Sequence, residues 1–246
     1  METNLRLDDL QINNLKLWQD PDLFCFGTDA VLLANFACPK SKDILLDIGT
    51  GNCIIPVLLS AKCDTKSMTA LEIQPKCAEL SQKNVSYNNL DSIIKVVLGD
   101  INDEKLFSPA SFSYITCNPP YKPEGTGLKN PDSPLAIARH EILCTLEDII
   151  KRSSTLLMSK GKLCMVHKPE RAAEIIYLMK QYRIEPKRIC TVHSHEGEVP
   201  CLVLIEGAKD GGTGLKWEQP ITIYDNDGNY TANVDKLYKK SKEVKR

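Results

Sequence analysis

The chain has 246 residues, of which 42% are hydrophobic and 26% charged, and its formal net charge is −1. This length and mixture are typical of one large folded α/β domain, and they exclude disordered and fibrous proteins. No stretch has the apolar length needed to span a membrane, and the first nine residues lack the features of a secretory signal, so we expect a cytoplasmic protein.

Residues 1–43 are expected to form a cap segment on the rim of the main sheet. They contain a short apolar run, Ala30–Phe36, which predicts a helix. Thr28 and Asp29 stand directly before this run, and two interpretations of them are open. They cap the start of the helix, or they reach a bound small molecule.

From residue 44 onwards, short apolar runs alternate with longer amphipathic ones, which is the pattern of parallel strands joined by crossover helices. The predicted strands are Ile44–Gly49, Met68–Ile73, Ile94–Gly99, Phe112–Asn118, Lys162–His167, Lys187–His193 and Cys201–Glu206. The predicted helices are Ile54–Lys62, Pro75–Asn88, Thr145–Ser159 and Pro169–Tyr182. The last two strands are joined by a segment too short for a helix, so we expect a seven-stranded, mostly parallel sheet with an antiparallel edge strand.

The predicted sheet and its helices form one domain over residues 44–235, and a basic tail follows over 236–246. Lys122–Pro134 is rich in glycine and proline, which predicts a mobile loop. The ten cysteines show no CxxC or clustered Cys/His spacing, and most lie in apolar strings. They are therefore expected to be reduced core residues, and no metal site is expected.

Positive charge is concentrated in two segments of the sequence. Ten Lys and Arg residues oppose three acidic residues between Lys151 and Arg188, and six oppose one between Lys236 and Arg246. Local positive charge suits a polyanionic partner, because neutralising phosphates provides most sequence-independent affinity. On charge alone, however, a solvated helix face and a solvated tail are the simpler interpretation.

The first predicted strand runs into a glycine turn, Gly49-Thr50-Gly51, just before a helix. The missing side chains let backbone amides approach a ligand there. The dinucleotide fingerprint Gly-x-Gly-x-x-Gly is broken at Ile54, whereas the methyltransferase pattern acid-x-Gly-x-Gly-x-Gly is matched by Asp47 and by both glycines. Cys53 stands where that pattern has its last glycine.

Acidic residues also follow the next two predicted strands. Glu72 ends the second strand, where its carboxylate can accept hydrogen bonds from both hydroxyls of a ribose. Asp100 follows the third strand, where it can accept from an adenine amino group while Ile101 packs on the ring. Surface charge explains each acid singly, whereas acids at three consecutive strand ends indicate a nucleotide-like cofactor, either NAD or S-adenosylmethionine (SAM).

The tetrapeptide Asn118-Pro119-Pro120-Tyr121 follows the fourth predicted strand, at the same rim as the glycine turn. An amino group on a planar carbon is a poor nucleophile because its lone pair is delocalised. The Asn118 side-chain oxygen and the Pro119 carbonyl can accept its two hydrogens and turn it towards tetrahedral geometry, while Tyr121 stacks on the planar substrate. The motif therefore favours in-line methyl transfer from SAM over a simple tight turn.

Six motifs together resemble the bacterial tRNA1(Val) adenine-N6 methyltransferases, which act on nucleotide 37 beside the anticodon. They are Phe26–Leu33, Asp47–Asn52, Asn118–Tyr121, Ala138–Glu141, Glu185–Arg188 and Ile223–Asp225. The resemblance implies a Rossmann-like SAM-dependent methyltransferase with SAM as its cofactor and tRNA as its partner. The candidate cofactor-binding residues are Thr28, Asp29, Asp47, Gly49, Thr50, Gly51, Glu72, Asp100, Ile101 and Asn118, and the candidate catalytic residues are Asn118, Pro119 and Tyr121.

Other substrates stay open at this point. Related Asn-Pro-Pro-Tyr enzymes methylate a glutamine of release factors, a guanine N2 in rRNA or an adenine in DNA. The basic segments favour a polyanionic target over a peptide, and an RNA loop offers an unstacked base. A non-catalytic RNA-binding module is disfavoured by the intact Asn118 and Tyr121. The sequence does not determine the oligomeric state, and a monomer is the simplest expectation.

Overall fold

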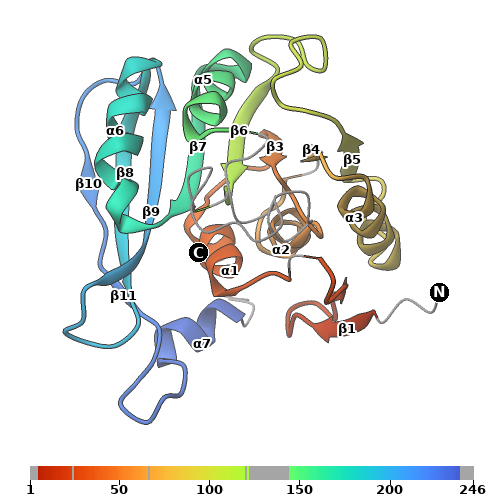
Figure 1. Ribbon diagram of the computed structural model, residues 1–246, viewed down its shortest axis with the longest axis vertical. Coiled ribbons are helices and arrows are strands. Elements are labelled where there is room, and N and C mark those ends of the chain that lie inside the picture. The colour runs from red at the N-terminus through yellow and green to blue at the C-terminus, as the bar shows by residue number, and fades with distance from the viewer. Residues whose placement is uncertain (1–4, 24, 66, 120, 122–143, 239–246) are drawn as a thin grey trace.

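The structure, a computed structural model, describes residues 5–23, 25–65, 67–119, 121 and 144–238. A nine-stranded sheet forms its centre (Figure 1). The strands are β3 (Ile44–Ile48), β4 (Ser67–Glu72), β5 (Ile94–Leu98), β6 (Phe112–Cys117), β7 (Leu157–His167), β8 (Ile184–His193), β9 (Pro200–Lys209), β10 (Lys216–Trp217) and β11 (Ile221–Thr222). The order across the sheet is β10-β8-β9-β7-β6-β3-β4-β5, and β11 also pairs with β8.

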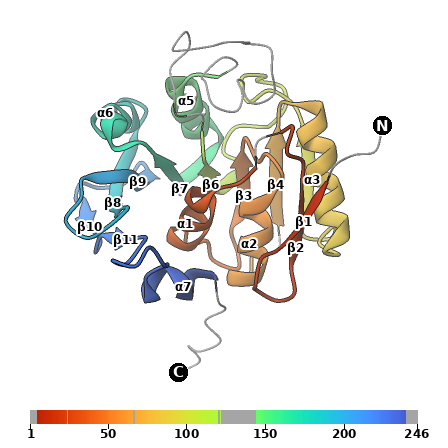
Figure 2. The same ribbon diagram turned by 60° about the horizontal axis from the view of Figure 1, so that its bottom comes forward.

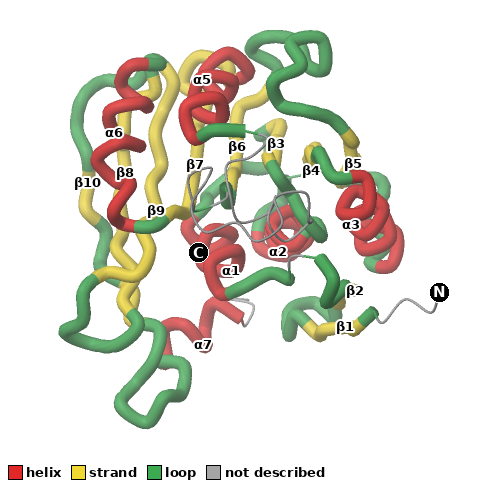
Figure 3. The backbone as a smooth tube through the Cα atoms, viewed as in Figure 1, coloured by secondary structure: helices red, strands yellow, loops and turns green. Residues whose placement is uncertain are grey.

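Helices cover both faces of this sheet, as the tube view in Figure 3 and the turned view in Figure 2 show. They are α1 (Thr28–Phe36), α2 (Ile54–Lys62), α3 (Pro75–Tyr87), α5 (Leu146–Leu156), α6 (Ala172–Gln181) and α7 (Ala232–Tyr238), with a short 3-10 helix at Pro169–Arg171. None of the described helices is long and apolar enough to cross a membrane.

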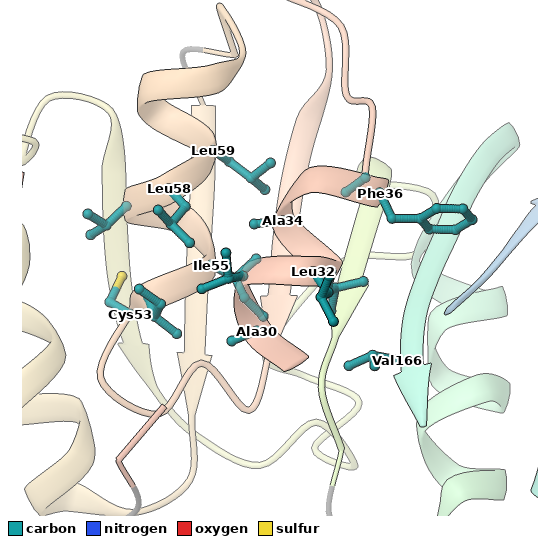
Figure 4. Close-up of a cluster of buried hydrophobic side chains, with 14 of the residues drawn as sticks. Ala30, Leu32, Ala34, Phe36, Cys53, Ile55, Leu58, Leu59 and Val166 are labelled. Carbon is teal, nitrogen blue, oxygen red and sulfur yellow. The ribbon is translucent and has the colours of Figure 1, made fainter. Parts of the chain in front are cut away.

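Two hydrophobic cores lie on opposite faces of the sheet, because successive side chains of a strand point to opposite sides. In β3, Leu45 packs with α1 and α2, whereas Leu46 packs with α5 and α6. The first core is drawn in Figure 4, where Ala30 and Ala34 of α1 lie against Ile55 of α2. Small residues on α1 let the two helices approach closely, so the start of α1 is fixed beside the strand ends.

All seven predicted strands are present, and the predicted mostly parallel α/β fold is confirmed. Two details of the edge differ from the prediction. The antiparallel strand β9 lies between β7 and β8, so it is not the outermost strand. The short strands β10 and β11 raise the number from seven to nine, and both run parallel to β8. Pro220 lies between them and has no N–H to donate to the sheet, which explains the interruption.

The helix predicted over Thr145–Ser159 ends at Leu156. The apolar spacing continues past this residue, but Leu157 instead pairs with Phe112 of β6 and begins β7. Tertiary pairing therefore ends the helix earlier than its sequence pattern indicates. The loop predicted over Lys122–Pro134 lies outside the described residues.

The N-terminal hairpin of β1 (Arg6–Asp9) and β2 (Lys16–Gln19) is attached to α3 by two asparagine side chains. Asn84 Oδ1 accepts from Trp18 N at 2.7 Å, and its Nδ2 donates to Trp18 O at 3.0 Å. Asn88, one helical turn later, makes the same pair of bonds to the backbone of Lys16, at 3.0 and 2.7 Å. Two amides one turn apart, at and just after the end of α3, thus bind backbone groups of β2 that its partner β1 leaves free.

We expect Asn84→Ala to lower the free energy of unfolding by about 2–4 kcal/mol, because the fully buried amide leaves backbone groups of Trp18 and Asn52 without partners. Chemical denaturation measures this change. Glu79→Ala, at an exposed position on the same helix, is the control and should change stability by less than about 0.5 kcal/mol. Equal stability of the two variants would contradict the role of Asn84 as the attachment of the hairpin.

Candidate active site

A cavity of about 810 Å³ lies at the carboxyl ends of β3, β4 and β6, next to the start of α1. Sites for small molecules typically have volumes of about 300–1,000 Å³. Parallel strands end at the same edge of a sheet, so residues distant in sequence meet in this cavity.

Ten of the twelve candidate residues line the cavity. They are Asp29, Gly49, Thr50, Gly51, Glu72, Asp100, Ile101, Asn118, Pro119 and Tyr121. Pro120 and the Ala138–Glu141 motif lie outside the described residues. The strand-end rule therefore brings the glycine turn, the acids and the described part of the tetrapeptide into one cavity.

The other two candidates, Asp47 and Thr28, are not among the described residues that line the cavity. Asp47 is fully buried behind the glycine turn, where its Oδ1 accepts from the Thr116 hydroxyl at 2.6 Å. Burial raises the pKa of Asp47 to about 7. Thr28 is the first residue of α1, and its hydroxyl lies 3.5 Å from the hydroxyl of Tyr230.

The glycine turn has a left-handed backbone at alternate positions. The φ angles are +67° at Gly49, +61° at Gly51 and +70° at Cys53. A side chain at either glycine would meet open space, so these positions require glycine because of their backbone angle and not because of crowding. Cys53 adopts the same strained conformation while its side chain is completely buried.

The Glu72 carboxylate joins the end of β4 to the glycine turn. Its Oε2 accepts from Gly51 N at 2.8 Å, and its Oε1 accepts from Ile73 N and Gln74 N, both at 2.9 Å. Burial raises the pKa of Glu72, and these three backbone bonds oppose that shift. A carboxylate has about four lone-pair sites, so Glu72 still has acceptor capacity for a ligand in the cavity.

The Tyr121 side chain connects α1 with the tetrapeptide. Its hydroxyl lies 2.6 Å from Asp29 Oδ2 and 2.8 Å from Asn118 Oδ1. Burial, together with the negative charge of Asp29, raises the pKa of Tyr121 well above its usual value, so the phenol stays protonated and donates. Asp29 therefore holds Tyr121 directly, while its other oxygen accepts from Ala30 N at 2.8 Å.

Two neighbouring residues at the end of β7 were missed by the sequence analysis. His167 is buried, and its ring centroid lies 5.3 Å from that of Tyr121. Its Nδ1 accepts from Lys168 N at 2.8 Å, and burial lowers its pKa to about 4, so the ring is neutral at pH 7. Lys168 lines the cavity, with its ammonium 5.7 Å from the Tyr121 ring centroid. The strand-end rule that identified Asn118 would have identified both residues.

The start of β9 lies at the same rim. Because β9 is antiparallel, it begins where β7 ends, and Pro200 and Cys201 line the cavity. All ten cysteines are free thiols. Among the described residues, no three or more His, Cys, Asp or Glu side chains are grouped as a metal site would need.

The strain at Cys53 can be measured by comparing glycine and alanine at two positions. At Cys53 we expect Gly to be at least as stable as Ala, since the relief of the left-handed backbone, about 1–2 kcal/mol, offsets the lost buried methyl group. At Cys77, which is buried within α3, Gly should be less stable than Ala by about 1–2 kcal/mol. Denaturant unfolding of the four variants measures both differences, and equal penalties at the two positions would rule out strain at Cys53.

Known proteins resemble this chain in both sequence and fold. Residues 14–185 match the methyltransferase small domain family. The tRNA1(Val) (adenine(37)-N6)-methyltransferase of Porphyromonas gingivalis is 30% identical over 73% of this chain and 72% of its own length. The protein of the same name from Bacteroides fragilis is also 30% identical, over 79% of this chain and 81% of its own.

Solved structures agree with the fold. A predicted O-methyltransferase from Agrobacterium tumefaciens superposes with a TM-score of 0.68 at 22% identity, covering 85% of this chain and 95% of its own. The tRNA m1G37 methyltransferase of M. jannaschii gives a TM-score of 0.61 at 14% identity, covering 86% of this chain and 59% of its own. The chain therefore belongs to the methyltransferase small domain family and, within it, to the bacterial tRNA1(Val) (adenine(37)-N6)-methyltransferase family, and it is a methyltransferase with a Rossmann-like fold.

Proposed function

We propose that this protein transfers a methyl group from SAM to the N6 atom of an adenine in tRNA, at nucleotide 37 of tRNA1(Val). The main support for the proposal is that Asn118, Pro119 and the glycine turn line the same cavity. The names of relatives that match most of the chain supply the substrate. A cytoplasmic location follows from a tRNA substrate.

The residues of the cavity fit the cofactor. Both glycines of the turn leave open space on their cavity side, and Glu72 keeps acceptor capacity for the ribose hydroxyls. Asp100 and Ile101 line the same cavity, where they would accept from the adenine amino group and pack on the ring. SAM supplies an electrophilic methyl group on a cationic sulfur, so the protein needs to provide alignment more than a strong base.

The target amine is held by the tetrapeptide. Asn118 Oδ1 and the Pro119 carbonyl accept its two hydrogens, which localises the nitrogen lone pair towards the methyl group. In the structure, the Tyr121 hydroxyl lies 2.8 Å from Asn118 Oδ1. Substrate binding therefore moves this hydroxyl off Asn118, while Asp29 remains its acceptor. Tyr121 then presents its ring to the base.

Positive charge contributes less to substrate choice than the sequence indicates. Six of the ten Lys and Arg residues between 151 and 188 form ion pairs with carboxylates: Arg152, Lys162, Arg171, Lys180, Arg183 and Arg188. Lys168, at the cavity, is suited to meet a phosphate of the bound nucleotide. Support for tRNA over the glutamine of a release factor therefore comes mainly from the relatives.

We also propose a separate role for each of three segments of the chain. Residues 1–43 cap the rim, since Phe26 and Asp29 line the cavity. Residues 44–235 form the methyltransferase domain, and the basic residues of 236–246 support RNA binding through phosphate contacts.

Replacing Asn118 separates catalysis from cofactor binding. We expect Asn118→Ala to reduce the rate of N6-methyladenosine formation about 100- to 1,000-fold, because one of two acceptors on the amine is lost. The affinity for SAM, measured by calorimetry, should change much less. The assay uses labelled SAM and total tRNA, followed by nucleoside analysis. Asn102→Ala, at an exposed site that does not line the cavity, is the matched control and should keep full activity.

Two results would contradict the proposal. Wild-type protein that forms no N6-methyladenosine in any tRNA would exclude tRNA adenine as the substrate, and labelling of a release-factor glutamine would then support the alternative. Wild-type turnover by the Asn118→Ala variant would show that the tetrapeptide does not take part in the reaction as proposed.

A further inference from the structure

Four aromatic rings form a row on the surface next to α1. The row consists of His195, Tyr224, Tyr230 and Tyr238, which we call the aromatic ladder. Successive ring centroids are 5.7, 5.5 and 5.5 Å apart. The planes of the three tyrosines are nearly parallel, at 13° and 17° to one another. These are offset stacks, the geometry in which aromatic rings attract each other.

The ladder is held in place by the backbone of three separate segments. Tyr224 N donates to Ser194 O at 2.9 Å, and Tyr224 and Tyr230 form an isolated antiparallel bridge. Tyr238 ends α7, which is anchored by the fully buried Val234. The stacked rings cover part of one another's faces, and Tyr230, between Tyr224 and Tyr238, stays 41% exposed. Because the three segments fix the rings, this exposed surface is already arranged for a ligand.

The ladder lies beside the active-site cavity. The Tyr230 hydroxyl is 3.5 Å from that of Thr28, and the next residue, Asp29, lines the cavity and bonds to Tyr121. At the other end of the ladder, His195 lies in the connection between β8 and β9. Pro200, the first residue after this connection, also lines the cavity. Figure 1 shows α7 next to α1, in agreement with this placement.

The exposure and the aromatic character of the ladder indicate what it binds. Tyr230 is 41% exposed, and the other three rings are half-buried. Charges of both signs lie near the rings: Glu198 is 3.5 Å from His195, and Lys236 precedes Tyr238 by two residues. The rings themselves have apolar faces and polar edges, which suit uncharged, planar groups with polar edges. Nucleobases have these properties, and every base has a face that stacks on an aromatic ring.

We propose that the aromatic ladder is a second binding site, which stacks unpaired bases that neighbour the target adenine in an RNA loop. This inference rests on the proposed function and extends it. Drawing the target base into the cavity removes it from between its neighbours, and those neighbours lose a stacking partner. The ladder replaces that partner, so a single-stranded loop binds better than a duplex.

The experiment compares Tyr230→Leu with Tyr230→Phe in the full-length protein. The probes are a hairpin RNA with the sequence of the anticodon arm and a fully paired duplex of the same length. Leucine keeps apolar packing but removes the aromatic face, so we expect about 5- to 150-fold weaker hairpin binding, the loss of one base–aromatic stack. Tyr230→Phe should bind the hairpin within about twofold of wild type, and duplex binding should be equal for all three proteins.

Salt dependence gives an independent readout. Stacking releases no counterions, so Tyr230→Leu should lower hairpin affinity without changing the slope of log affinity against log salt. A hairpin with 5-bromouridine beside the adenine should also photocrosslink wild-type protein at a tyrosine of the ladder. This measurement needs no variant, so it holds even if Tyr230→Leu folds poorly.

Failures of the two proposals are distinguishable. The proposal of a second site alone would be overturned by three results together. Wild-type protein methylates the hairpin, Tyr230→Leu binds the hairpin as tightly as wild type, and crosslinks form only at residues outside the ladder. Equal loss of hairpin and duplex binding would likewise overturn it, because a stacking site needs unpaired bases. Wild-type protein that binds the hairpin but never methylates it would contradict the proposed function instead.

Discussion

The site depends on the turn between β3 and α2, where the chain adopts a left-handed backbone at Gly49, Gly51 and Cys53. Such a turn exposes polar backbone groups that must be satisfied from outside it. Glu72 accepts from Gly51 N at 2.8 Å, and the Ser81 hydroxyl on α3 donates to Gly51 O at 2.7 Å. Because the sheet and α3 hold the turn from behind, its glycine faces stay open to the cavity.

A second connection joins the N-terminal segment to the chemical motif. Asp29, at the start of α1, accepts from the Tyr121 hydroxyl at 2.6 Å, and the same hydroxyl contacts Asn118. The small residues that let α1 pack closely on α2 thus also set the position of the tyrosine that faces the substrate. The start of α1 lies next to the aromatic ladder through Thr28, so the packing of one helix positions the cavity and the neighbouring surface together.

The sequence was sufficient to predict the family, the parallel sheet and most of the cavity. Glu72, Asp100 and Asn118 could be assigned to one rim because each follows a buried strand, and parallel strands end together.

Contacts between distant segments could not be predicted in this way. Asp29 and Tyr121 are 92 residues apart, and nothing local indicates their bond. The acid-x-Gly pattern likewise does not reveal that Asp47 points to Thr116 behind the turn. Six of the ten basic residues of 151–188 form ion pairs, four of them with carboxylates from other parts of the chain, so their sequence density overstates the available positive charge.

The cavity methylates adenine N6 beside the anticodon of a tRNA. The most direct measurement is mass spectrometry of nuclease-digested tRNA from cells that lack the protein, from cells that contain it and from cells with the Asn118→Ala variant. We expect N6-methyladenosine at nucleotide 37 of tRNA1(Val) only in cells with the wild-type protein. Unchanged modification in cells that lack the protein, or its full restoration by the variant, would exclude this function.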